Sequence, residues 1–150
     1  MRRLRAWAPA AVWMGVIFAM SAMPGDVSGG QSGMIVQAAM KLASRLFGPQ
    51  AAARISPDML HLIVRKGAHM AEYAVLFCCF YRALRFEGAK RPGMIALLMC
   101  AGYAASDEIH QGFVAGRGPS SADVCIDTLG AAIAWALTRL YKKTKKETER

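Results

Sequence analysis

Residues that can exchange protons recur at helical spacing inside largely apolar stretches of this 150-residue chain. His69 and Glu72 lie one helical turn apart in one such stretch, and Asp107 and Glu108 lie near the end of another. A histidine exchanges protons near neutral pH, and two carboxyl groups held close together can act as donor and acceptor. We therefore take these four residues as candidate catalytic residues.

Further polar side chains accompany them and are candidates for binding a substrate. These are Ser21, Lys66, Tyr73, Gln111, Arg117, Ser120, Asp123 and Asp127. Among them, Lys66 and Arg117 can hold an anionic group such as a phosphate or a carboxylate. Simple ion pairing is the competing interpretation, in which Arg117 pairs with Asp123 and Lys66 pairs with an acidic residue of the 107–108 pair. No activated nucleophile is evident, so the sequence leaves open whether the chain is an enzyme.

A metal site is a further alternative at the same residues. Asp107, Glu108 and His110 would have to add ligands to those of the 69–72 turn. The order His-x-x-Glu is the reverse of the Glu-x-x-His pairs that build carboxylate-bridged sites in helical bundles. His110 is also poorly phased with its acidic neighbours. We therefore assign no metal and no cofactor from the sequence.

Four apolar segments must position these residues, at about 6–23, 68–84, 93–107 and 122–141. Each approaches the roughly 20 residues that a membrane-spanning helix needs, the third only if its outer end carries the acidic pair. The composition is 55% hydrophobic, which is high for a soluble domain. The sequence therefore predicts an all-α, polytopic membrane protein with four transmembrane helices, folded as a single domain over residues 1–150.

The net charge of +9 raises the question of nucleic-acid binding. The basic residues flank the apolar segments, however, and do not line one amphipathic face, so we expect no nucleic-acid partner. They gather before the first segment, between the second and third, and after the fourth, where residues 142–150 form a basic tail. Positively charged loops remain in the cytoplasm, which predicts that both termini are cytoplasmic. A cleavable signal peptide is the alternative interpretation of the first segment.

The first connection is long, at about 24–67, and also carries basic residues, including Arg65. Its glycine-rich start predicts a flexible turn. Apolar residues at positions 34, 35, 38, 42 and 46 then predict an amphipathic helix on the outer membrane surface, which either covers a pocket or only rests on the membrane. Ser56 and Pro57 predict the start of a helix that runs into the second segment.

The polar residues are expected to share one layer near the outer face. Ser21, His69, Asp107 and Asp123 each lie about 24 Å along a helix from a basic residue at the cytoplasmic end of the same segment. The hydrocarbon core is about 30 Å thick, and a single charge inside it is costly. These side chains should therefore face one another around a site, or form a structural polar network that only fixes helix packing.

The order and spacing of the polar residues resemble the VanZ-like membrane proteins, a family named for a protein linked to teicoplanin resistance. The matching pieces are Ser21-x-x-Pro24-Gly25, Lys66-x-x-His69-x-x-Glu72-Tyr73, Asp107-Glu108-x-x-Gln111-x-Phe113, Gly116-Arg117-x-x-Ser120-x-x-Asp123 and Asp127-x-x-Gly130. They touch all four segments. The chain departs from the pattern at Asp127, where the family is expected to have Asn.

This resemblance implies a multi-pass protein of the bacterial cytoplasmic (inner) membrane with an outward-facing polar pocket. The pocket would bind or act on cell-envelope components and contribute to glycopeptide (teicoplanin) tolerance. The expected partners are the lipid bilayer and lipid-linked cell-wall intermediates or glycopeptides. The alternatives are a membrane-embedded hydrolase or transferase for a lipid-linked or phosphate-containing substrate, and a structural network without a ligand.

Overall fold

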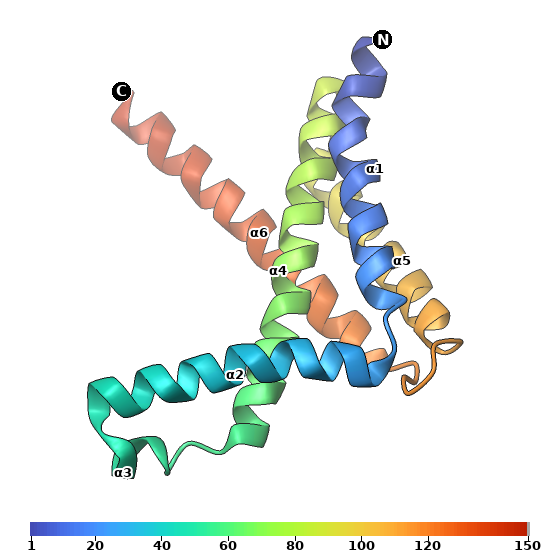
Figure 1. Ribbon diagram of the computed structural model, residues 1–150. Helices are drawn as coiled ribbons and strands as arrows, with labels where there is room; N and C mark the ends of the chain where they lie inside the picture. Colours follow the sequence, from blue (N-terminus) through green and yellow to red (C-terminus); the bar gives the residue numbers. More distant parts are fainter. Residues whose placement is uncertain (150) are drawn as a thin grey trace.

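The computed structural model describes residues 1–149, apart from the side chain of Gln31, and all regular structure in this range is helical (Figure 1). The helices are α1 (Arg2–Ser21), α2 (Gly25–Phe47), α3 (Pro49–Ala52), α4 (Pro57–Phe86), α5 (Pro92–Gln111) and α6 (Ser121–Thr148). The all-α prediction is confirmed. Arg150, at the end of the predicted basic tail, lies outside the described residues.

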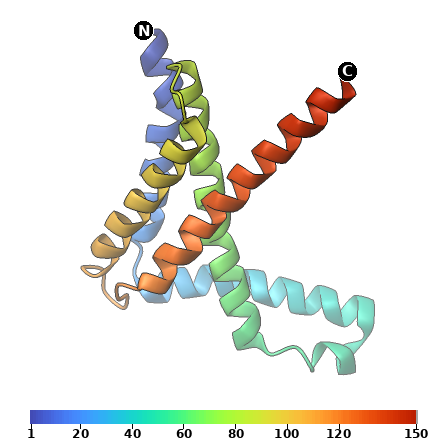
Figure 2. The same cartoon turned by 180° about the vertical axis from the view of Figure 1, so that it is seen from behind.

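The helices α1, α4 and α5 lie side by side, with the N-terminus and the α4–α5 connection at the same end (Figures 1 and 2). The helix α6 crosses α4 and then diverges from it, so that its C-terminal end also lies toward that end of the molecule. The helix α2 lies across the opposite end of the upright helices. The two ends of the molecule therefore differ in the elements that they present.

The start of α4 follows from local sequence, as predicted. The side chain of Ser56 accepts a hydrogen bond from the backbone N–H of Met59, and Pro57 occupies the first helical position. Both features favour a helix start because they satisfy or remove backbone donors that have no partner within the helix. From there α4 continues without interruption through the predicted second segment to Phe86.

The flexible turn predicted for the glycine-rich segment is wrong, because α2 begins directly at Gly25. Each glycine disfavours a helix by about 1 kcal/mol relative to alanine, so tertiary contacts must compensate. The N–H of Gly25 donates a 3.1 Å hydrogen bond to the carbonyl of Ala115 in the α5–α6 connection. A Cβ at Gly25 would lie 2.3 Å from the carbonyl oxygen of Gly116, so this contact requires glycine. Farther along α2, Val36 is buried.

The hydrophobic core combines aromatic residues of α4 with small residues of its neighbours. Tyr73 and Phe77 are fully buried, as are Ala104 of α5 and Ala131 of α6. The helices α4 and α6 pack closely at Gly130, where a Cβ would lie 2.2 Å from the carbonyl oxygen of Met70. Small residues let helix backbones come this close, which is typical of helix pairs in membranes.

Two helices within residues 1–149, α1 and α6, are long and apolar enough to cross a membrane. Only 22% of each apolar window is buried inside the protein, so most of the apolar side chains of these windows face outward. The helices α4 and α5 do not meet the same criterion, and these two carry most of the predicted site residues. The four-span topology therefore stays a prediction.

Candidate functional site

A cavity of about 130 Å³ lies between α1, α2, α4, α5 and the α5–α6 connection. Its polar lining residues are Ser21, Ser28, Ser32, Arg65, His69, Glu72, Asp107 and Arg117. Of the predicted site residues, the cavity thus brings together those at positions 21, 69, 72, 107 and 117. The remaining predicted residues do not line it, and several of them contact one another or a cavity residue.

One face of α4 supplies three of the ionisable groups. Arg65, His69 and Glu72 follow one another at four and three residues, which places them on one stripe of the helix. Arg65 lines the cavity although it was predicted only as a basic residue of the first connection and not as a site residue. The signal was present in this spacing, since a helix starting at Pro57 puts position 65 one turn before His69.

Arg117, in the α5–α6 connection, reaches the cavity and forms no ion pair with any of the residues that the structure describes. Its predicted ion pair with Asp123 is wrong, and within residues 1–149 its buried Nε has no hydrogen-bond partner. Burial lowers the pKa of the guanidinium from its usual value, and the nearby charge of Arg65 lowers the pKa further, while the carboxylate of Asp107 raises it. An arginine stays protonated in proteins, so a positive charge with free donor capacity faces the cavity.

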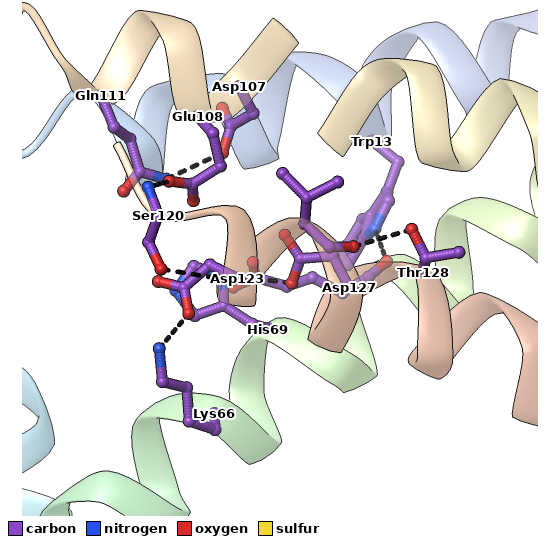
Figure 3. A network of polar contacts seen from close by, with 12 residues as sticks. Trp13, Lys66, His69, Asp107, Glu108, Gln111, Ser120, Asp123, Asp127 and Thr128 are labelled. Atoms are coloured by element: carbon purple, nitrogen blue, oxygen red, sulfur yellow. Dashed lines mark hydrogen bonds and ion pairs between the residues drawn. The ribbon is translucent and has the colours of Figure 1, made fainter. Parts of the chain in front are cut away.

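Lys66 is turned away from the cavity and forms an ion pair with Asp123 of α6 (Figure 3). The predicted pairing of Lys66 with Asp107 or Glu108 is therefore wrong. The cause is the packing of α6 along α4, the most extensive helix contact, which puts the first turn of α6 next to Lys66. The carboxylate of Asp123 is buried, whereas the side chain of Lys66 is 27% exposed, so the pair is only partly enclosed.

The start of α6 is capped by residues from two helices. Ser120 Oγ accepts a 3.3 Å hydrogen bond from the N–H of Asp123, as the capping pattern predicts. In a capping box the residue at position 123 would also accept from the N–H of Ser120, but that N–H donates a 2.7 Å bond to Oε2 of Glu108. Glu108 therefore joins α5 to α6, and Asp123 is free to pair with Lys66.

Asp107 faces both the cavity and its own helix. Its Oδ2 accepts a 3.0 Å hydrogen bond from Nε2 of Gln111, one turn later in α5. Its other oxygen, Oδ1, is buried without a hydrogen-bond partner among residues 1–149, and so is Oγ of Ser21. Buried polar atoms normally have partners, so these atoms and Nε of Arg117 leave hydrogen-bonding capacity open around the cavity. A polar ligand or water can satisfy them.

A family model described as VanZ/LLP1 matches residues 6–142. The chain belongs to the VanZ/LLP1 family. The match covers all four apolar segments and every predicted site residue. No curated protein and no solved structure matches the chain. Family membership and the two apolar helices together indicate a membrane protein.

Two residues of this VanZ/LLP1 chain lie directly behind the cavity. Asp127 is fully buried, and its Oδ1 lies 3.6 Å from Nδ1 of His69, slightly beyond hydrogen-bond distance. Neither oxygen of Asp127 has a hydrogen-bond partner within the described part of the chain. Tyr73 is also fully buried, and its side chain belongs to the core. His69 thus stands between a buried carboxyl group and the cavity.

A metal site is the alternative that the sequence left open at these residues. Within residues 1–149, no three or more His, Cys, Asp or Glu side chains are close enough together to hold a metal ion. Instead the acidic groups are distributed over separate contacts: one pairs with Lys66, one caps α6 and one bonds to Gln111. The cavity lining itself carries two cationic and two acidic side chains.

Proposed function

We propose that this VanZ/LLP1 protein crosses the bacterial cytoplasmic membrane four times, through α1, α4, α5 and α6, with both termini in the cytoplasm. Both termini and the α4–α5 connection lie toward one end of the molecule (Figures 1 and 2). The basic clusters of the sequence belong to these same parts, as the positive-inside rule requires. The helix α2 lies across the other end, where it would rest on the outer membrane surface.

Outward-facing apolar side chains on α1, α5 and α6 support this placement. Val12 of α1 is 67% exposed, Leu98 of α5 is 66% exposed and Leu137 of α6 is 60% exposed. A soluble protein rarely leaves such side chains in contiguous patches, whereas hydrocarbon solvates them. The helices α4 and α5 have a lower mean hydropathy because they carry the polar residues that line the cavity. In membrane proteins, charged residues of the helices face such interiors.

The cavity then opens near the outer face and binds the polar headgroup of a cell-envelope component. Its volume of about 130 Å³ is well below the roughly 300–1,000 Å³ of sites that enclose whole drug-sized ligands. Arg65 and Arg117 suit a phosphate or carboxylate group, while Glu72 and Asp107 accept hydrogen bonds from hydroxyl or amino groups. Lipid-linked cell-wall intermediates combine such groups, and their lipid would remain along the apolar helix surfaces.

This function connects to glycopeptide tolerance through the envelope. A glycopeptide such as teicoplanin is far larger than the cavity, so the antibiotic itself would not be enclosed. Binding or altering the headgroup of a cell-wall intermediate would instead change the envelope components to which the antibiotic is exposed outside the cell. The observation that carries the proposal is that Nε of Arg117 and acceptors of the same cavity have no hydrogen-bond partner among residues 1–149.

A membrane-embedded hydrolase or transferase is the second candidate, favoured by one observation. The hydroxyl of Ser21, which is buried without a partner among residues 1–149, lines the same cavity as His69. A hydroxyl and an imidazole together are the elements of an activated nucleophile and its base. Conversion of the bound intermediate would distinguish this candidate from binding alone.

One experiment with the purified protein in lipid nanodiscs separates these functions. A lipid-linked cell-wall intermediate is titrated, and both bound ligand and converted ligand are measured by mass spectrometry. Arg117→Gln is expected to weaken binding by about tenfold or more, because a charge-assisted contact in an enclosed site is lost. Arg54→Gln, which changes an exposed arginine outside the cavity, is the matched control and should bind normally.

Turnover that His69→Ala and Asp107→Asn both abolish, without loss of folding, would establish the enzyme. Saturable binding without conversion would establish the binding protein. If the native chain neither binds nor converts the intermediate, or if Arg54→Gln weakens binding as much as Arg117→Gln, the proposed ligand class is wrong.

A further inference from the structure

A second hollow lies between α4 and α6, nearer to the two termini than the cavity is. It is an open groove of about 880 Å³, formed where α6 diverges from α4 beyond their contact at Gly130 (Figures 1 and 2). Its floor is apolar: Val75 of α4 is 42% exposed, and Leu137 of α6 is 60% exposed. Ile133 and the exposed Cys78 extend the same surface.

The end of the groove toward the C-terminus is basic on both walls. Four cationic residues line it: Arg82, Arg85, Lys142 and Lys145. Lys142 donates a hydrogen bond to the hydroxyl of Tyr81, which fixes its ammonium group at the groove wall. Lys145 also lies 3.6 Å from Glu149, but within the described residues no acidic side chain lines the groove itself. The groove thus has one charged end and one apolar end.

We propose that this groove binds one anionic phospholipid of the cytoplasmic leaflet. Its phosphate lies between the arginines of α4 and the lysines of α6, and an acyl chain follows the apolar floor toward Val75. This inference rests on the membrane placement proposed above but is independent of the outer cavity and its ligand. Basic pockets between membrane helices on the cytoplasmic side are suited to acidic lipid headgroups.

The dimensions and the charge pattern favour a lipid over a second copy of the chain. Along α4, the distance from Arg85 to Val75 is about 15 Å, which accommodates a headgroup and the upper part of an acyl chain. In a symmetric dimer the same surface would meet itself, so the basic ends would be brought toward like charges. Basic residues flank most membrane helices, so positive charge alone does not identify a lipid site. The feature that identifies this site is the position of the basic residues on the groove.

The helix α6 offers a matched control for this position. Lys143 and Lys146 alternate with the groove lysines in sequence but do not line the groove. Lys142→Gln/Lys145→Gln and Lys143→Gln/Lys146→Gln therefore remove equal charge from the same helix. All four lysines are exposed, so both double variants are expected to fold.

The test uses the full chain in a neutral detergent, titrated with phosphatidylglycerol or with phosphatidylcholine of the same acyl chains. Phosphatidylglycerol is expected to raise Tm saturably, with one tightly bound molecule counted by native mass spectrometry. Lys142→Gln/Lys145→Gln should weaken this binding by about tenfold, whereas Lys143→Gln/Lys146→Gln should leave it within about twofold. Thiol labelling of Cys78 should slow when phosphatidylglycerol is bound, and labelling of Cys125, which lies outside the groove, should not.

Three results would overturn the proposal. Equal stabilisation by phosphatidylcholine would show that the apolar floor alone binds lipid. Equal losses in the two double variants would show that general positive charge is responsible. A dimer in which Cys78 is protected without added lipid would show that a second copy covers the groove.

Discussion

Asp127 and Asp123 are both buried near the start of α6, but their surroundings differ. Asp123 has an ammonium partner in Lys66, whereas the basic neighbour of Asp127 among the described residues is the imidazole of His69, 3.6 Å away. A buried carboxylate costs free energy unless it is paired and hydrogen-bonded. The two residues should therefore respond in opposite directions when each is replaced by its neutral amide.

Asp127→Asn is expected to increase the free energy of unfolding by about 1 kcal/mol or more, because an amide of the same shape carries no charge into the interior. Asp123→Asn is expected to decrease it by a few kcal/mol, because Lys66 loses its partner. Thermal or chemical unfolding of the purified variants measures both. A loss of stability in Asp127→Asn would show instead that the carboxyl group stabilises His69.

For single residues, the sequence indicates which side chains lie near the cavity better than it indicates which side chains contact each other. His69 and Asp107 line the same cavity, and helical spacing could indicate this because it decides which side of a helix a residue occupies. Helical spacing did not predict the partner of Lys66, because that partner depends on how α6 crosses α4. That crossing is set by tertiary packing, which no local pattern encodes.

The crossing of α4 and α6 is the element-level feature on which the site depends. It brings Lys66 to Asp123 and His69 toward Asp127, and it is possible only because Gly130 lets the two backbones touch. Gly130, one of the residues of the family pattern, therefore has a packing role and not a chemical one. The sequence could identify Gly130 as part of a pattern, but not the carbonyl of Met70 that occupies the space of its missing side chain.

Gly130→Ala is expected to lower stability by about 1–3 kcal/mol, because the added methyl group overlaps backbone atoms of α4 that cannot move independently. Gly102→Ala is the control, since a Cβ at Gly102 in α5 meets nothing within 4 Å, and it should be neutral or slightly stabilising. Thermal unfolding compares the two. Equal stability in both variants would contradict the close packing of α4 and α6 at Gly130.

At the scale of the whole molecule, the long first connection shows where sequence reasoning was weakest. The amphipathic periodicity correctly indicated a helix, but the glycine-rich start was interpreted as a turn. Composition describes the intrinsic preference of a segment, whereas the contact of Gly25 with Ala115 lies far away in sequence. The helices α4 and α5 do not meet the composition criterion for a membrane span, because the polar groups that line the cavity make them less apolar.

The proposed topology predicts a difference in reagent access between the two ends of the molecule. Gly118→Cys, in the α5–α6 connection, is expected to react in intact cells with a thiol reagent that cannot cross the membrane. Lys90→Cys, in the α4–α5 connection, should react only after the cells are permeabilised. The unsubstituted chain sets the background from its own four cysteines. The reverse pattern would place the cavity on the cytoplasmic side.

The hydrogen bond from Gly25 to Ala115 has a consequence for how a ligand reaches the cavity. It joins the first turn of α2 to the connection that carries Arg117, so these two segments are held together at this corner. Ser28, Ser32 and Ile35 of α2 form part of the cavity wall just beyond this corner. Any movement of α2 about this corner would therefore displace its distal end, near Phe47, more than its first turn beside the connection that carries Arg117.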